Sequence, residues 1–124
     1  MKLVLALFAT MLAIGAVSFW LWRAAPPVAP CDNRVLSEAA SPDGRFMAAA
    51  YERRCSQSVT THVALRPFKA SFKPQGDVFV AAGLERIALR WPEERQLVVE
   101  SPAQRVLVQE TSWRGVGVRV VLVR

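Results

Sequence analysis

An uninterrupted run of apolar and small residues fills positions 3–22, between Lys2 and Arg23. A helix rises about 1.5 Å per residue, so this run reaches roughly 30 Å, the thickness of the hydrocarbon core of a bilayer. The sequence therefore predicts a single membrane-inserted helix over residues 1–23. Any folded domain must come from the remainder of the chain.

The same run is compatible with two fates. Residues 3–14 could be the apolar core of a secretory signal peptide, since small residues suitable for cleavage follow at 16–18. We favour a retained anchor because the run continues through Phe-Trp-Leu-Trp at 19–22, and tryptophans beside an arginine are typical of a membrane–water interface. Cleavage, giving a secreted soluble protein, is the alternative. Lipidation of Cys31 is disfavoured, since Pro30 stands where a lipidated cysteine usually needs Gly, Ala or Ser.

A short linker and two cysteines follow the apolar run. Residues 24–30 contain three prolines, which predict an extended, polyproline-like linker. Cys31 and Cys55 are the only cysteines, and an even count just beyond an export segment fits an oxidising compartment. We expect a disulfide worth about 3 kcal/mol, with two separate buried thiols as the alternative. This places the domain of residues 31–124 in the periplasm, on the outer side of a bacterial inner membrane.

The domain is predicted to be all-β. Short β-prone runs separated by turn sequences indicate a small antiparallel sheet domain of seven to eight strands, arranged as a meander or sandwich. The Ser-Pro-Asp-Gly sequence at 41–44 suits a tight turn, since Pro fixes φ near −65° and Gly lets the chain swing back. It should join the first two strands as a hairpin. The predicted strands cover residues 35–38, 45–53, 60–67, 77–81, 86–91, 96–100, 105–110 and 116–123.

Alternation of apolar and polar residues identifies the buried side of these strands. Ile87, Leu89 and Trp91 share one side, as a half-solvated sheet requires. The same logic buries residues 63 and 65 and turns His62 and Arg66 outward to solvent. Residues 116–123 lose the alternation, which favours a core strand covered on both sides over an edge strand that meets a partner.

Several of these motifs together resemble a known family. The turn at 41–44 with the Arg-Phe that follows it, the Tyr-Glu-Arg at 51–53, Cys55, and the segments 61–65, 76–80 and 89–91 with Leu97 are similar to a family of small uncharacterised bacterial exported proteins, many of them lipoproteins. The resemblance extends from Cys31 to about Val120. It implies a disulfide between Cys31 and Cys55 and brings no known activity. The Pro30 that precedes Cys31 departs from the lipoprotein members.

The sequence offers little catalytic chemistry. His62 is the only histidine, no Gly-x-Ser-x-Gly motif is present, and two cysteines with one histidine fall short of a four-ligand zinc set. We therefore expect no catalytic residues, no metal and no cofactor. The alternative is a small envelope hydrolase or thiol-redox accessory protein that uses His62 or the cysteine pair.

The remaining functional signal is positive charge. The chain carries a formal net charge of +6, and most of this excess lies outside the apolar run. A basic face would favour an anionic surface or another envelope protein, and nucleic acid is not expected in that compartment. We therefore expect a membrane-anchored, non-catalytic binding module, and the sequence does not specify its oligomeric state. The candidate binding residues are Arg45, Arg53, Arg54, Arg66, Lys69 and Lys73.

Overall fold

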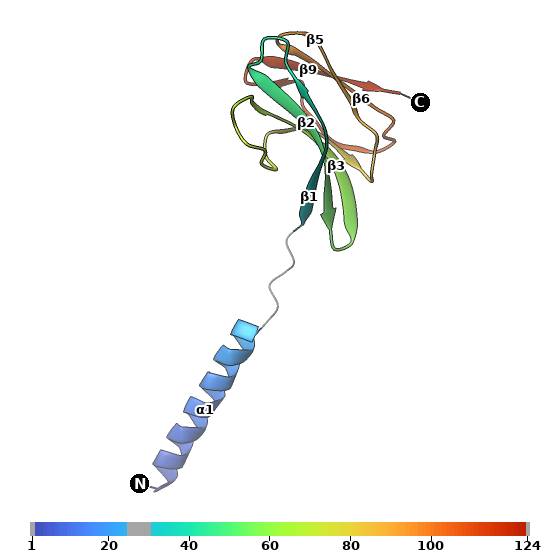
Figure 1. Ribbon diagram of the computed structural model, residues 1–124. Coiled ribbons are helices and arrows are strands. Elements are labelled where there is room, and N and C mark those ends of the chain that lie inside the picture. The colour runs from blue at the N-terminus through green and yellow to red at the C-terminus, as the bar shows by residue number, and fades with distance from the viewer. Residues whose placement is uncertain (1, 25–30, 124) are drawn as a thin grey trace.

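The computed structural model describes residues 2–24 and 31–123, and its first element is one long helix, α1 (Lys2–Ala24). No proline interrupts this segment, and none of its apolar stretch Lys2–Trp22 is buried against the rest of the described chain. By length and composition α1 can cross a membrane, and a signal sequence would meet the same criteria. Figure 1 shows α1 in blue, before the β domain. Most of the predicted linker, residues 25–30, lies outside the described residues.

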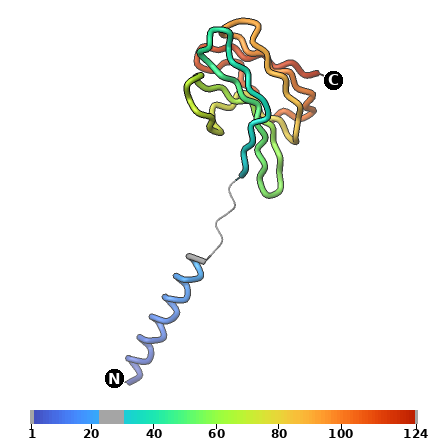
Figure 2. Tube along the Cα trace, in the orientation of Figure 1, coloured from blue at the N-terminus to red at the C-terminus, as the bar shows by residue number. Residues whose placement is uncertain are grey.

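Nine strands in two sheets follow within residues 31–123, so the predicted class, an N-terminal helix and a small, mostly antiparallel β domain, is confirmed. One sheet has the strand order β1-β2-β3-β4-β7 and the other β5-β6-β9-β8. Figure 2 follows the chain through them. The strands are β1 (Asp32–Ala40), β2 (Phe46–Cys55), β3 (Ser58–Pro67), β4 (Asp77–Ala82), β5 (Ala88–Glu93), β6 (Gln96–Ser101), β7 (Val106–Gln109), β8 (Ser112–Trp113) and β9 (Val116–Leu122).

The hydrophobic core lies between the two sheets. Leu65 and Phe79 from the first sheet and Leu97 and Val99 from the second are almost completely buried in it. Each such side chain contributes about 1.5 to 3 kcal/mol through its removal from water. Trp91 packs at the margin of this core, and its Nε1 donates to the carbonyl of Ala39 at 3.0 Å, which links β5 to β1. Residues 63 and 65 lie in this core, and Ile87, Leu89 and Trp91 pack against it, as the period-two pattern predicted.

The hairpin predicted at residues 41–44 joins β1 to β2. The amide of Gly44 donates to the carbonyl of Ser41 at 2.9 Å, and the carboxylate of Asp43 accepts from Ser41 Oγ at 2.7 Å and from the amide of Arg45 at 3.2 Å. The bond from Ser41 is the main reason why the pKa of Asp43 lies below its ordinary value.

The second half of the domain is more complex than a meander. Strands β1 to β4 pair in chain order, but β7 returns to pair with β4, while β6 and β9 pair in parallel. Strand β9 lies between β6 and β8, but β8 pairs only with Val116 and Gly117. Leu122 is 54% exposed, so the prediction that residues 116–123 form a core strand covered on both sides is wrong for the end of that run.

The segment between β3 and β4, residues 68–76, covers part of the outer face of the first sheet, the side away from the core. Here we call it the β3–β4 connection; it is yellow-green in Figure 2. The ring of Phe72 meets that of Tyr51 at 5.1 Å in an edge-on contact, and Tyr51 stacks on His62 at 4.8 Å. His62 does lie on the outer face, but only 6% of it is exposed, so its predicted solvent exposure is wrong. Alternation predicts the face of the sheet on which a side chain lies, but it does not predict whether a loop covers that face.

Candidate functional site

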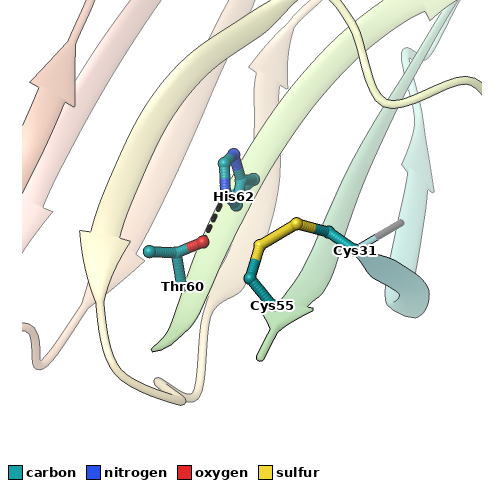
Figure 3. Close-up of a disulfide and its surroundings, with 4 residues drawn as sticks. All are labelled: Cys31, Cys55, Thr60 and His62. Atoms are coloured by element: carbon teal, nitrogen blue, oxygen red, sulfur yellow. Dashed lines mark hydrogen bonds between the residues drawn. A yellow bond between two sulfur atoms is a disulfide. The ribbon is translucent and has the colours of Figure 1, made fainter. Parts of the chain in front are cut away.

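The disulfide joins the residue before β1 to the last residue of β2. The sulfurs of Cys31 and Cys55 are 2.06 Å apart, which confirms the predicted pair, and Figure 3 shows the bridge close to Thr60 and His62. The bridge lies at the end of the domain where the chain enters it. Both cysteines are oxidised in this state, so neither presents a thiolate nucleophile or metal ligand.

Four polar side chains beside the bridge form a hydrogen-bonded chain on the outer face. Thr60 Oγ1 is 2.7 Å from Nε2 of His62, Nδ1 of His62 is 3.0 Å from Asp77, and the hydroxyl of Tyr51 donates to Asp77 at 2.6 Å. If Nδ1 carries the proton and donates to Asp77, Nε2 of the neutral ring accepts from Thr60. Figure 3 shows the Thr60–His62 contact as a dashed line.

A bulge brings Asp77 into this chain of bonds. Tyr51 pairs with His62 across β2 and β3, and the β3–β4 register shifts by one residue after Val63, so that Asp77 lies opposite Ala64. Without the shift Asp77 would lie opposite Leu65, whose side chain is in the core. The bulge therefore turns the carboxylate to the outer face, where its partners are.

The environment shifts the pKa values of both acids in this chain of bonds. Burial alone would raise the pKa of Asp77, but the hydrogen bonds from His62 and Tyr51 outweigh it and hold the pKa below its ordinary value. Burial, followed by the bond and the negative charge of Asp77, raises the pKa of Tyr51 well above 10. At neutral pH the arrangement therefore holds an ionised Asp77 and a neutral Tyr51.

Thr60, His62 and Asp77 stand in the order of a hydroxyl–imidazole–carboxylate triad. Such a triad requires its imidazole to exchange a proton with a substrate that reaches the hydroxyl. Only 8% of the His62 side chain is exposed, and Tyr51 stacks on its ring. The hydrogen bonds and the burial of His62 therefore support a structural role for these residues. Catalysis would require that a substrate reach Thr60.

The six candidate basic residues separate into two groups. Arg53 and Arg54 lie near the disulfide end of β2, whereas the other four lie at the opposite end of the first sheet or in the β3–β4 connection. Three of the six form ion pairs: Arg54 with Glu52 at 2.7 Å, Arg45 with Asp43 at 3.6 Å, and Arg66 with Glu38 at 2.9 Å. Lys69 and Lys73 form no ion pair with any residue that the structure describes.

An open pocket of about 600 Å³ lies at the end of the first sheet away from the disulfide. Arg66, Lys73 and Arg114 contribute to its lining, together with Gly76 and Trp113, and none of the described residues that line it is acidic. We call it the basic pocket. Two of its three cations were among the candidates from the sequence, and the fold brings Arg114 to them from a distant segment.

Arg66 holds the β3–β4 connection in place. Its Nε donates to the carbonyl of Ala70 at 3.1 Å, its Nη2 donates to Glu38 at 2.9 Å, and its guanidinium lies 5.6 Å from the centre of the Phe72 ring. Nη1 is buried and has no hydrogen-bond partner. Arg66 is therefore a structural cation that is paired with Glu38 and keeps one unsatisfied N–H donor near the pocket wall.

Arg114 occupies an unusual backbone position. It has φ +44° and Gly115 has φ +83°, and the two residues form the turn between β8 and β9. Such a turn prefers Asn or Gly at the first position, and a left-handed conformation costs other residues about 1 to 2 kcal/mol. The guanidinium of Arg114 lies 5.0 Å from the centre of the Trp113 ring. The Trp-Arg-Gly sequence before β9 is the local signal for this turn.

Comparison with known protein families found no match, and comparisons with curated proteins and with solved structures found none either. Within residues 2–24 and 31–123, no three His, Cys, Asp or Glu residues are grouped so that they could hold a metal ion. The candidate site is thus characterised by the geometry of its cations and donors.

Proposed function

We propose that this chain is a membrane-anchored, non-catalytic binding module of the bacterial cell envelope. Its β domain would lie in the periplasm and bind an anionic surface or an acidic envelope protein. The observation that carries the proposal is a group of three cations, Lys69, Lys73 and Arg114, which have no ion-pair partner among the residues described. With Arg45 and Arg66 they make up what we call the basic end of the domain.

The anchor and the disulfide support the compartment. α1 is long and apolar enough to span a bilayer, and the Cys31–Cys55 bridge suits an oxidising environment. A protein released by signal cleavage would carry the same β domain as a soluble envelope protein. The basic end would then act in solution rather than beside a membrane.

Unpaired cations at a surface attract anions and steer their approach. A cation that already pairs with a carboxylate contributes little further attraction, because much of its field is cancelled. Lys69 and Lys73 lie four positions apart in the β3–β4 connection, and both contribute positive charge to the basic end. The binding is expected to weaken as salt rises, since the Debye length falls to about 8 Å at physiological ionic strength.

The test uses the full-length protein in nanodiscs of neutral phosphatidylcholine, with polyaspartate and anionic vesicles as separate probes. The Lys69→Glu/Lys73→Glu variant should bind polyaspartate at least 10-fold more weakly, a loss of about 1.4 kcal/mol. A matched control, Arg105→Glu/Arg119→Glu, reverses two exposed and unpaired charges elsewhere on the domain. Equal losses in both variants would show that net charge, rather than the basic end, governs binding.

A small hydrolase is the second candidate, favoured by the 2.7 Å and 3.0 Å contacts that order Thr60, His62 and Asp77. A fluorophosphonate probe would label Thr60 of the full-length protein, and Thr60→Val would abolish the label. No labelling of folded wild-type protein would exclude this candidate and leave the binding module.

A further inference from the structure

We infer that the basic pocket binds the phosphate group of a soluble or polymeric ligand. This inference deepens the proposed function and rests on it, because it names the ligand chemistry of the basic end. The pocket is about 600 Å³, which suffices for a phosphate with an attached sugar-sized group.

The donors around the pocket suit phosphate oxygens. Lys73 and Arg114 bring unpaired cationic donors, and an arginine can bind two phosphate oxygens at once. Nε1 of Trp113 lies beside Gly76, since a Cβ built on that glycine would be 3.5 Å from it. In the described part of the chain this indole N–H, which can only donate, has no acceptor. An anion in the pocket would accept from these groups together.

Arg66 adds an unsatisfied donor behind these groups. Its charge is paired with Glu38 through Nη2, but its buried Nη1 has no hydrogen-bond partner among the described residues. A buried charged donor without an acceptor is costly, and an anion nearby would reduce that cost. Among the residues that the structure describes, no carboxylate lines the pocket to compete for it.

Arg114 keeps its charge at the pocket despite an unfavourable backbone. Its φ of +44° belongs to a turn position where Asn or Gly would be more stable. Backbone strain of this kind is found most often at residues whose side chains take part in binding or catalysis. Here the guanidinium lies over Trp113, 5.0 Å from the ring centre, so it is held next to the free indole N–H.

The position of the pocket favours a ligand that arrives from solvent over a lipid of the anchoring bilayer. The chain enters the domain at Cys31, which is bridged to Cys55 at one end of β2. The pocket lies at the other end of the same sheet, beside Pro67. A ten-residue strand spans about 30 Å, so the pocket is far from the point of attachment.

The experiment titrates the full-length protein in neutral nanodiscs with glucose 6-phosphate, glucose and inorganic phosphate, and measures binding by calorimetry. Glucose 6-phosphate should bind saturably and be displaced by inorganic phosphate, while glucose should not bind. Arg114→Asn removes the charge and suits the turn, so affinity should fall at least 10-fold while the melting temperature stays equal or rises. Trp113→Phe, which removes only the N–H donor, should weaken binding, and Arg105→Asn should leave it unchanged.

Four results would overturn the inference. Equal affinity of Arg114→Asn and wild type would show that the phosphate does not bind in this pocket. Failure of both phosphate probes, with polyaspartate still bound through Lys69 and Lys73, would reject the pocket and preserve the proposed function. Binding to nanodiscs of anionic lipid, without binding to either soluble phosphate, would assign the basic end to a membrane surface. Loss of all anion binding would reject both proposals.

Discussion

Gly76 lies at a position that tolerates no side chain. A Cβ there would come within 2.6 Å of the carbonyl oxygen of Leu65, and the backbone has φ +77°. The carbonyl of Gly76, for its part, accepts from the amide of Leu65 at 3.1 Å, so the strand and the β3–β4 connection approach each other closely. The connection keeps its path over the outer face because this residue is glycine.

Alanine substitutions at two glycines separate the cost of a positive φ from the cost of the close approach at Gly76. Gly44→Ala meets only the cost of a positive φ, since nothing lies within 4 Å of the added Cβ, and should destabilise by about 1 kcal/mol. Gly76→Ala adds a backbone clash and should destabilise by about 3 kcal/mol. Urea unfolding of the full-length protein in detergent measures both. Equal losses would mean that the close approach at Gly76 costs nothing.

Asp77 should govern the stability of the domain in acid. Its folded pKa lies below the ordinary value of 3.8, so its contribution is complete above that pH and is lost as the pH falls through the folded pKa. Asp77→Asn should therefore lower stability at pH 7 by about 1 to 2 kcal/mol and flatten the decline below pH 4. Tyr51→Phe, which removes one of two donors to the carboxylate, should shift the decline to slightly higher pH. Melting curves from pH 2 to pH 7 measure these effects, and three identical acid profiles would contradict the assignment.

At the scale of elements, the strands were the most predictable part of the molecule. Each predicted strand overlaps an observed one, because period-two alternation and turn residues such as Pro42 and Gly44 are local signals. The bulge after Val63 was not predictable in this way, because it depends on how β4 docks against β3. That single shift in register determines whether the side chain of Asp77 lies on the core face or on the outer face of the sheet.

The disulfide is expected to stabilise the domain because it restricts the unfolded chain between the two cysteines. Cys31 and Cys55 are separated by 24 positions, for which restriction of the unfolded chain gives about 3 kcal/mol. The double variant Cys31→Ser/Cys55→Ser, which leaves no lone thiol, should melt roughly 10 to 20 °C lower. Thermal melts of the full-length protein should show the same drop on reduction of the wild type and none on reduction of the variant. A reduced wild type that melts within a degree of the oxidised form would remove this role from the bridge.

At the scale of the whole molecule, the retained anchor can be tested directly. Intact-mass spectrometry of membrane and soluble envelope fractions, with and without reduction, distinguishes the two fates of α1. We expect the full-length mass in the membrane fraction, increased by two hydrogens on reduction of the Cys31–Cys55 bridge. A mass that begins near Phe19 in the soluble fraction would instead show a cleaved signal peptide and a secreted domain.

The sequence by itself determined the apolar helix, the all-β class, the first hairpin and the pairing of the two cysteines. These follow from composition, periodicity and spacing, which act within a few residues of one another or through a single possible pair. Only the tertiary structure decided that Phe72 and Tyr51 cover His62, and that Arg114 joins Lys73 at one pocket. The reason is physical: side chains far apart in the chain meet only through the packing of loops and sheets, and no local pattern records that packing.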